Sequence, residues 1–443
     1  MSASSEAPRG SLLKVLGVAF GIAMIVGNTI GVGILRTPGE IAAQLPSAPW
    51  FYGVWLVGGV YALLGALTLA ELGAMIPKSG GQYIFARRAL GEYAGFTIGW
   101  TDTISSAAST AAITISMGEY SDALFPPLAG HATAVAVTLV VALVLVNWRG
   151  IKAGDLTQQV TSVLKTVVLV GLAVLCLFTA PAPSASSASS VLSVSSAFPG
   201  LALVVLALQG VIYTYDGWNG VLYFSGEVKN PGREIPRAMA GGVLVVVGIY
   251  FLLLIGYSHV LTLPGMAGDK LVAASTARVI FGTAGDRIVR AIILVSLLSA
   301  ANAIVLLTSR VPYAMARDGL LWRRMGDVNT GGTPVISLAI TAAIAIGLIL
   351  SGTFGQVLAL ASFFFVFQYA ISFVSLIVLR RREPDTPRPF RIRPYPWLPF
   401  FLLLGALAFL AGNLMTDTRN SLWSVALLVG SWPVFRLMKG AGS

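Results

Sequence analysis

The sequence has 443 residues, of which 56% are hydrophobic and only 11% are charged. Soluble domains carry about 25% charged residues, so a soluble globular protein of this length is excluded and lipid must cover much of the surface. A net charge of +11 is compatible with nucleic-acid binding. In a membrane protein, however, excess Lys and Arg belong to the cytoplasmic loops. We therefore expect the lipid bilayer, and no nucleic acid, as a partner.

Cysteine and histidine are too few for a metal centre. The one cysteine, Cys176, lies in an apolar stretch, and the two histidines, His131 and His259, are far apart in the chain. A disulfide framework or a thiolate metal site cannot be assembled from these residues. Clustered carboxylates, histidines or cysteines typical of a membrane enzyme are also missing. We expect no metal, no cofactor and no catalytic residue.

Nearly uncharged stretches that are long enough to cross a bilayer as helices recur twelve times. The first has no charge from Val15 to Leu35 and is too long for a signal-peptide core, so it is predicted to be a mature span. Pro334 and the turn at 351–355 divide one charge-free stretch into two helices. The predicted spans are 14–43, 50–76, 93–124, 133–148, 157–180, 197–226, 238–262, 287–316, 334–351, 355–379, 395–414 and 420–436.

Basic residues predict the orientation of these spans. With the N-terminus inside, 22 of the 29 Lys and Arg residues fall in cytoplasmic segments and five fall outside. Because positive loops stay in the cytoplasm, both termini are predicted to be cytoplasmic. The protein is accordingly predicted to be a multi-pass protein of the cell membrane.

The order of the spans suggests an internal repeat. Two units of five spans each open with a helix interrupted by glycine, at Gly31 and at Gly217, which are 186 positions apart. A five-span unit reverses its orientation when it is repeated, and paired interrupted helices mark transport sites. The predicted divisions are a cytoplasmic tail (1–13), a first inverted repeat (14–181), an outer Ser-rich loop (182–196), a second inverted repeat (197–381) and two final spans (394–437).

The first interruption has the sequence Gly27-Asn-Thr-Ile-Gly-Val-Gly-Ile-Leu35. Gly31 and Gly33 permit unusual backbone angles and a close approach of a ligand to the main chain. Unwinding here would free N–H groups at the start of a second half-helix, which favours an anion such as a carboxylate. The alternative is close packing of helices through small residues.

The second interruption has the sequence Tyr213-Thr-Tyr-Asp-Gly-Trp-Asn-Gly220. An aspartate within a span is costly and usually functional, which makes Asp216 a candidate site residue. Carbonyl groups freed here would attract a cation, so the two interruptions together fit the carboxylate and ammonium of an α-amino acid. Alternatively, backbone amides satisfy Asp216 as a buried group. Tyr215 and Trp218 are expected to pack in the core.

Three further polar residues lie within or near spans. Lys165 is predicted to face protein, where its ammonium could occupy the place of a sodium ion beside the first interruption; the alternative is that it extends to the cytoplasmic surface. Asn302 is a candidate for lining the cavity, with a bond between helices as the alternative. Glu71, which precedes the motif Pro77-Lys-Ser-Gly-Gly-Gln-Tyr83, is interpreted as part of a structural hinge.

These motifs together resemble the amino acid–polyamine–organocation superfamily, and within it the L-type amino acid transporters. Further matches are Glu227-Val-Lys-Asn-Pro231, Ile235-Pro-Arg237, Ser309-Arg310 and Ala316-Arg-Asp-Gly319. The resemblance covers almost the whole chain. It implies an all-α LeuT-type fold, with a five-plus-five inverted repeat, 12 transmembrane helices, and helices 1 and 6 unwound at mid-membrane.

The resemblance also implies roles for individual residues. Amides of Val32, Gly33 and Ile34 would bind the substrate carboxylate, Tyr213 matches an aromatic gate, and Lys165 matches the lysine that replaces sodium. Val32 and Asp216 depart from the small residues that the family often has at these positions, so a narrower pocket or a cationic substrate is implied. The ammonium would be bound by the carbonyls of Thr29, Ile30, Tyr213, Thr214 and Asp216.

The sequence therefore predicts a sodium-independent amino acid transporter, an exchanger or uniporter that works by alternating access, with neutral amino acids favoured. The alternative is a proton-coupled symporter, or a carrier of cationic amino acids or polyamines, that uses Asp216 and Lys165. A channel would need a continuous polar pore, which the spans do not provide. The expected partners are an amino acid and lipid, and a homo-oligomer is left open.

Overall fold

The computed structural model describes residues 17–440 except 79, 149–153, 180–198 and 331, and some side chains within helices, those of 154–165 among them, lie outside the description. The described chain consists of helices and their connections, and no strand is found in it. The predicted tail (1–13) and Ser-rich loop (182–196) fall outside the described residues.

Each of the twelve predicted stretches contains a helix. Between them lie the short helices α4 (Gln82–Leu90), η1 (Pro126–Leu128), α10 (Leu263–Met266) and η4 (Arg323–Gly326), and α12 (Arg310–Arg317) overlaps the end of the eighth stretch. The helices of the twelve stretches are α1 (Val18–Thr29) with α2 (Val32–Gln44), α3 (Ala48–Met75), α5 (Glu92–Leu124), α6 (Ala132–Trp148), α7 (Gly154–Phe178), α8 (Leu201–Tyr215) with η3 (Gly220–Glu227), α9 (Pro231–Leu261), α11 (Val272–Thr308), α13 (Val335–Ser351), α14 (Phe354–Arg382), α15 (Trp397–Thr416) and α16 (Thr418–Gly440).

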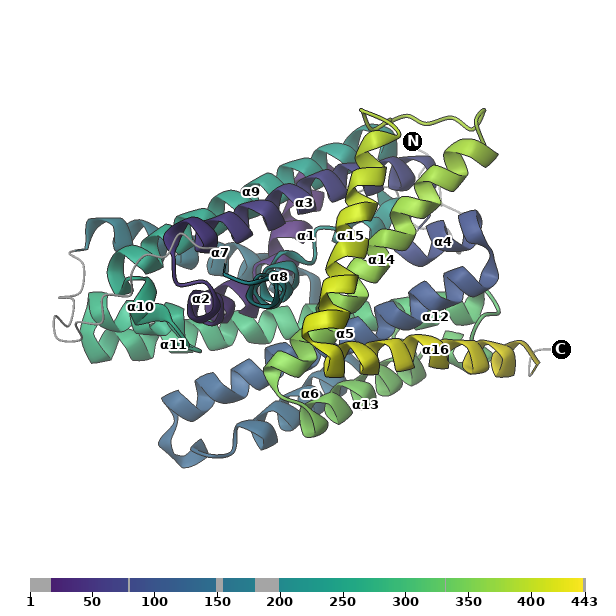
Figure 1. Ribbon diagram of the computed structural model, residues 1–443. Helices are drawn as coiled ribbons and strands as arrows, with labels where there is room; N and C mark the ends of the chain where they lie inside the picture. Colours follow the sequence, from purple (N-terminus) through teal and green to yellow (C-terminus); the bar gives the residue numbers. More distant parts are fainter. Residues whose placement is uncertain (1–16, 79, 149–153, 180–198, 331, 441–443) are drawn as a thin grey trace, which may run out of the picture.

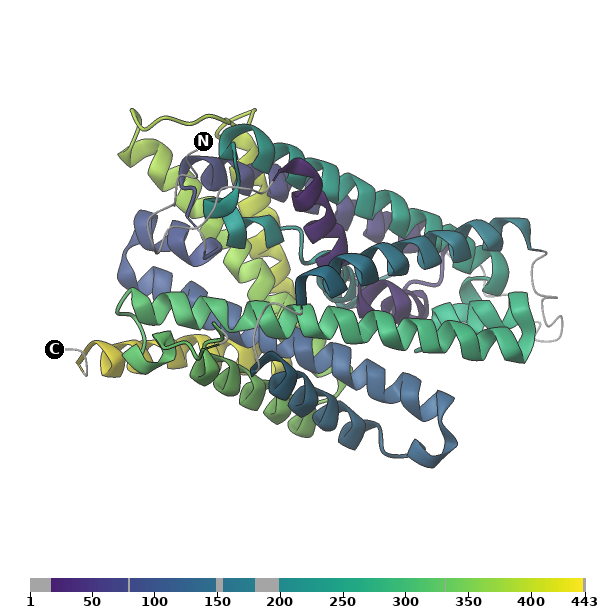
Figure 2. The ribbon, with the colours of Figure 1, turned by 180° about the vertical axis from the view of Figure 1, so that it is seen from behind.

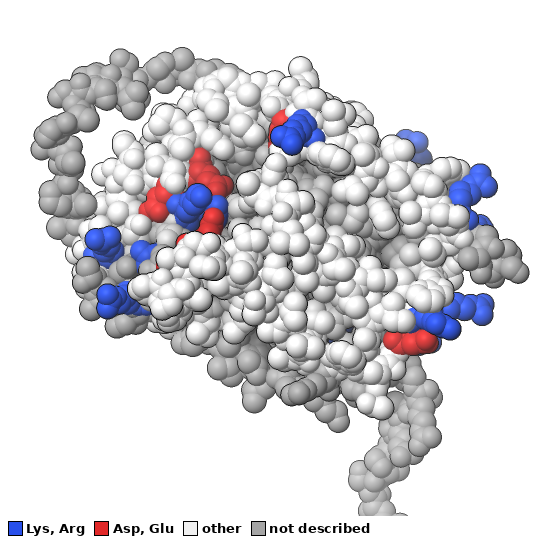
Figure 3. Space-filling model, turned by 90° about the horizontal axis from the view of Figure 1, so that it is seen from below, with Lys and Arg blue, Asp and Glu red and all other residues white. Residues whose placement is uncertain are grey.

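The described helices are those of a multi-pass membrane protein. Seven are long and apolar enough to cross a bilayer, or eight if the bent pair α1 and α2 counts as one span. α6 and α13 are apolar but have only 17 residues each. α5 has 33 residues, but its many Ser and Thr residues lower its hydropathy. On the face shown in Figure 3, most charged side chains lie toward the two ends of the molecule, and most of the surface between them is uncharged.

The eighth predicted stretch differs in its bounds. The sequence predicts a span that begins at 287, whereas α11 begins at Val272 and bends at Gly282, where φ is +69°. Arg278 lies in the part of α11 before 287, and a charged residue there is expected to lie outside the bilayer. Charge limits how far a helix stays in lipid, not how far the helix continues into water, so a hydropathy pattern cannot locate this end.

The interrupted helices occupy the centre of the molecule. α1, α2 and α8 lie between α3 and α9 on one side and α5 and α11 on the other (Figures 1 and 2). α2 packs on α8, α1 packs on α9, and α14 packs on both α5 and α8. The breaks in α1–α2 and α8–η3 are therefore held within the bundle rather than at its surface.

A buried group of charges joins α3 to the end of α14 and the segment that follows it. Glu71 on α3 is fully buried. Its carboxylate pairs with Arg380, whose Nε lies 2.7 Å from Oε1, and accepts a bond from the backbone N–H of Ile392 at 2.8 Å. Arg388 lies 3.6 Å from the same carboxylate. This group fixes the ends of two long helices and supports a structural role for Glu71.

Candidate functional site

The first break is a short extended linker between two helices. α1 ends at Thr29, Ile30 is extended (φ −75°, ψ 95°), and α2 begins at Val32 with its axis turned by 47°. The first N–H groups of a helix have no acceptor within the helix. At the start of α2 they also lack a side-chain cap, because the N-cap residue is Gly31. These N–H groups form the positive end of the α2 dipole.

The second break is a turn rather than a linker. α8 ends at Tyr215, Asp216 is extended (φ −60°, ψ 152°), and Gly217 has φ +110°, a conformation that favours glycine. A Cβ atom at Gly217 would lie 2.9 Å from Thr29 Oγ1. The turn of the second break therefore packs directly on the end of α1, so the two interruptions meet.

One tyrosine joins the ends of both first half-helices. The Tyr250 hydroxyl on α9 donates to the carbonyl oxygens of Thr29 at 2.7 Å and of Thr214 at 2.8 Å. Tyr250 is completely buried. A hydroxyl has one hydrogen, so it serves both acceptors only by sharing it. Sequence analysis missed Tyr250, because nothing in the apolar α9 stretch marks which residue meets the breaks.

The start of α2 packs on α8 through threonine hydroxyls. Thr37 Oγ1 donates to the Gly33 carbonyl at 2.7 Å and lies 2.8 Å from Thr214 Oγ1, which in turn donates to the Gly210 carbonyl at 2.7 Å. A Cβ atom at Gly33 would lie 2.8 Å from the Cα of Thr214. Gly33 is therefore needed for contact between the two interrupted helices.

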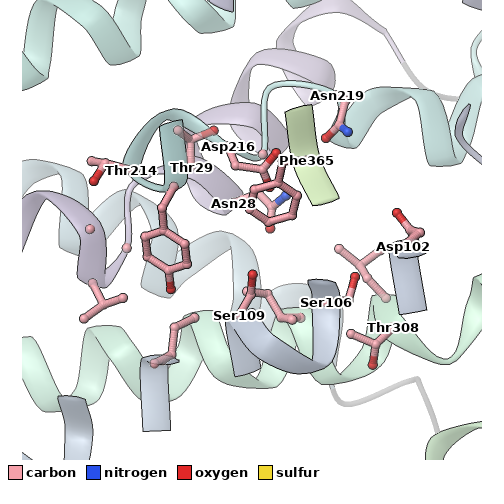
Figure 4. A pocket seen from close by; sticks show the side chains of 18 of the residues that line it. Asn28, Thr29, Asp102, Ser106, Ser109, Thr214, Asp216, Asn219, Thr308 and Phe365 are labelled. Atoms are coloured by element: carbon pink, nitrogen blue, oxygen red, sulfur yellow. The ribbon is translucent and has the colours of Figure 1, made fainter. Parts of the chain in front are cut away.

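A cavity of about 80 Å³ opens where the two breaks meet (Figure 4). A water molecule needs about 10–15 Å³ of such volume, so the cavity has room for several water-sized groups. The walls come from both breaks, from α5, α11 and α14, and from η3. They include Asn28, Thr29, Gly31, Val32, Gly33, Asp102, Ser106, Ser109, Tyr213, Thr214, Asp216, Gly217, Asn219, Tyr223, Thr308, Phe365 and Gln368.

Most of the predicted binding residues line this cavity: Thr29, Val32, Gly33, Tyr213, Thr214 and Asp216. Ile30 and Ile34 are buried beside it and are not among its lining residues. Lys165 lies on α7, and its side chain is outside the described part of the structure. Asn302 on α11 does not line the cavity; its side-chain oxygen accepts from Asn147 at 2.8 Å, which is the bond between helices that was the alternative.

Asp216 faces the cavity with one partner from the surrounding helices. Its Oδ1 accepts a hydrogen bond from the hydroxyl of Tyr369 on α14. Tyr369 also packs against Trp218, with ring centroids 4.8 Å apart. Tyr215 packs against Trp55 and Tyr250, and neither Tyr215 nor Trp218 lines the cavity. The core role predicted for these two aromatic residues is confirmed.

A second carboxylate, Asp102 on α5, also lines the cavity, and sequence analysis did not single it out. It begins a series with Ser106, Ser109 and Ile113 at helical spacing, so one face of α5 is turned toward the cavity. The signal was present in the sequence, because Asp102 lies within the predicted span 93–124 and charged residues in spans are usually functional.

The wall beyond Tyr213 is closed by an aromatic and ionic stack. The Tyr213 and Phe354 rings meet edge to face with centroids 6.1 Å apart, and the Arg36 guanidinium lies 3.9 Å over the Phe354 ring. Arg36 pairs with Glu40 on α2 and with Glu119 on α5. This stack connects α2, α5, α8 and α14 on one side of the cavity.

Tyr250→Phe is expected to slow transport about fivefold while leaving the protein folded. The variant removes the single donor that joins the Thr29 and Thr214 carbonyls, and a hydrogen bond contributes about 1 kcal/mol net. The measurement is the initial rate in proteoliposomes, together with the melting temperature in detergent. Tyr257→Phe on the same helix is the control, because its buried hydroxyl has no partner among the described residues. Equal rates for both variants would contradict the role of Tyr250.

A helical membrane protein in which two interrupted helices enclose a polar cavity has the architecture of a transport protein. The family comparison is specific: a family model described as "Amino acid permease" matches residues 16–432. The chain belongs to this amino acid permease family. It is an amino acid transporter and not an enzyme.

Curated relatives match over nearly the whole chain. The serine/threonine exchanger SteT of Bacillus subtilis (strain 168) is 29% identical over 433 residues, which cover 97% of this chain and 97% of the relative. The b(0,+)-type amino acid transporter 1 of Rattus norvegicus is 30% identical over 90% of this chain and 82% of its own. The large neutral amino acids transporter small subunit 2 of Homo sapiens is 26% identical over 91% and 78%.

Proposed function

We propose that the chain is a sodium-independent amino acid exchanger with a LeuT-type fold. In this proposal, twelve transmembrane helices form two inverted repeats (14–181 and 197–381) and a final pair (394–437). α1–α2 and α8–η3 are helices 1 and 6, unwound at mid-membrane. They move against the surrounding helices in alternating access. The protein lies in the cell membrane, and both termini face the cytoplasm.

One observation supports this proposal above all: both interruptions contribute to a single cavity, and together they supply groups of both polarities. The N-terminus of α2 offers the free N–H groups of Val32, Gly33 and Ile34 to a carboxylate. The ends of α1 and α8 offer carbonyl groups to an ammonium. Of these carbonyls, those of Thr29 and Thr214 accept hydrogen bonds from the hydroxyl of Tyr250. An α-amino acid carries both a carboxylate and an ammonium, and could therefore bind to both sets of groups.

Transport is expected to be independent of sodium. Lys165 would place an ammonium at the position where sodium would bind, and two like charges about 4 Å apart repel by about 4 kcal/mol in an effective dielectric of 20. The measurement is uptake of a radiolabelled amino acid by proteoliposomes in sodium buffer and in choline buffer. A dependence on sodium greater than tenfold would contradict this prediction.

Substrate charge separates two candidate classes. Neutral amino acids are the class that the resemblance implies, and Val32 would narrow the pocket beside the first break. The second class is cationic amino acids, polyamines or a co-transported proton, and one observation favours it: the described cavity contains two carboxylates, Asp102 and Asp216.

Exchange and net uptake are separated by one experiment. Proteoliposomes loaded with unlabelled alanine, or left empty, are tested with a panel of labelled neutral, cationic and anionic amino acids. An exchanger is expected to accumulate label only in loaded vesicles. Equal accumulation in both would indicate a uniporter, and no accumulation of any amino acid would contradict the proposal.

The oligomeric state has two candidates, a homo-oligomer and a complex with another subunit, since one relative is named a small subunit.

A further inference from the structure

Asp102 has the surroundings of a functional carboxylate rather than those of a structural one. It lies on α5, is 8% exposed and lines the cavity. Among the described residues its carboxylate has one hydrogen-bond partner, the Tyr223 hydroxyl, which donates to Oδ1 at 2.5 Å. The buried structural carboxylate Glu71 has two arginines and a backbone N–H instead. Asp102 therefore keeps acceptor capacity that the surrounding protein does not use.

The charge of the cavity is not balanced by its walls. Asp102 and Asp216 extend from different elements, α5 and the α8 break, toward the same space (Figure 4). Neither Lys nor Arg is among the lining residues that the structure describes. Burying carboxylates without a cation is costly, so the arrangement favours a ligand that brings positive charge.

A further polar group in the same wall lacks a partner. The Thr29 hydroxyl belongs to a residue that is 95% buried, lines the cavity, and finds no hydrogen-bond partner within the described part of the chain. Buried hydroxyls in native proteins are almost always paired with protein or with a ligand. This unused group is independent of the two carboxylates and also indicates that the cavity is built for a polar occupant.

Tyr223 is held in place by the glycine turn of the motif that sequence analysis interpreted as a hinge. Gly81 has φ +70°, and a Cβ atom there would lie 3.0 Å from Cε1 of the Tyr223 ring. The ring therefore rests on the bare backbone of the turn. The motif thus supports Tyr223 on η3, and Tyr223 in turn orients the Asp102 carboxylate.

We infer that Asp102 is a specificity-determining residue of the transport site, and that with Asp216 it admits amino acids with a second positive charge, such as lysine or ornithine. The inference rests on the proposed amino acid exchange and names its substrate class. The backbone groups at the breaks would bind the α-carboxylate and α-ammonium. The side-chain ammonium would then be bound between the two carboxylates.

The test measures exchange of labelled lysine and labelled alanine by the same proteoliposomes. Wild type is expected to exchange both. Asp102→Asn keeps the shape and an oxygen that can accept from Tyr223, and it is expected to lower the lysine-to-alanine ratio at least tenfold. Asp216→Asn is expected to lower the ratio as well. Asp102→Glu retains the charge and is expected to keep most of the ratio, and Tyr223→Phe is expected to lower it about two- to tenfold.

A matched control is Asp122→Asn, which removes a carboxylate on the same helix that does not line the cavity; its ratio is expected to equal that of wild type. Melting temperatures in detergent verify that each variant is folded. Two results would overturn this inference but leave the proposed function standing. The first is exchange of alanine but not lysine by wild type, and the second is an unchanged lysine-to-alanine ratio in Asp102→Asn. An equal loss for both substrates together with loss of a response to an imposed proton gradient overturns it in favour of proton coupling. No exchange of any amino acid overturns the proposed function itself.

Discussion

Gly33→Leu is expected to abolish substrate binding and exchange. A Cβ atom at Gly33 would lie 2.7 Å from Thr214 Oγ1 and 2.8 Å from Thr214 Cα, and these atoms can move only if α8 moves. The start of α2 would be pushed away from α8, and the N–H groups of α2 and the carbonyls at the end of α8 would no longer border the same cavity. The measurement is equilibrium binding of a labelled amino acid to purified protein, with the melting temperature as a check of folding.

Gly31→Ala is the control two positions earlier, in the linker that precedes α2. Its φ of −141° suits any residue, and no atom lies within 4 Å of the added methyl group. The methyl group would enter open space at the cavity wall, so this variant is expected to fold and to bind. Wild-type affinity in Gly33→Leu would show that substrate binds elsewhere.

Glu71→Gln is expected to lower the free energy of unfolding by about 3–5 kcal/mol, the usual cost of removing one partner from a buried ion pair. The change removes the carboxylate that pairs with Arg380 and that lies beside Arg388, whose side chain is 3% exposed. The expected result is a lower melting temperature and poor yield of folded protein in detergent, while any protein that folds retains its substrate selectivity.

The control for this prediction is Glu92→Gln. Glu92 pairs with Lys439 at 2.8 Å at the surface, where both side chains are about half exposed or more. Exposed pairs contribute little to stability, so no clear change in melting temperature is expected. Equal destabilisation by the two variants would mean that the Glu71 group does not act as a buried ion-pair network.

Several parts of the fold and site could be predicted from single residues. Gly31 and Gly217 predict breaks because glycine weakens the interior of a helix, and α1 and α8 indeed end beside these residues. The predicted binding residues Thr29, Val32 and Asp216 line the cavity because they belong to these breaks. The family prediction is confirmed by the match to amino acid permeases.

Other parts depend on which distant segments meet. Tyr250 and Tyr223 act on groups 36 to 221 positions away, and no local pattern separates them from other aromatic residues in apolar stretches. The same is true of Phe354, which connects Tyr213 to Arg36. Asp102 was accessible to sequence reasoning, because its cost in a span is visible without a structure.

The composition of α5 has a consequence for biosynthesis. This helix contacts α4, α6, α11, α13, α14 and α16, yet it is too polar to be among the helices that qualify as spans by hydropathy. Many of its hydroxyls donate to carbonyls one turn earlier, as Thr103 does to Gly99 and Thr114 to Thr110, so much of the polarity of this helix is satisfied within the helix itself. Insertion by the translocon follows hydropathy. α5 therefore depends for its place in the bilayer on partners that are synthesised after it, and a nascent chain that ends before α11 holds its central helix only weakly.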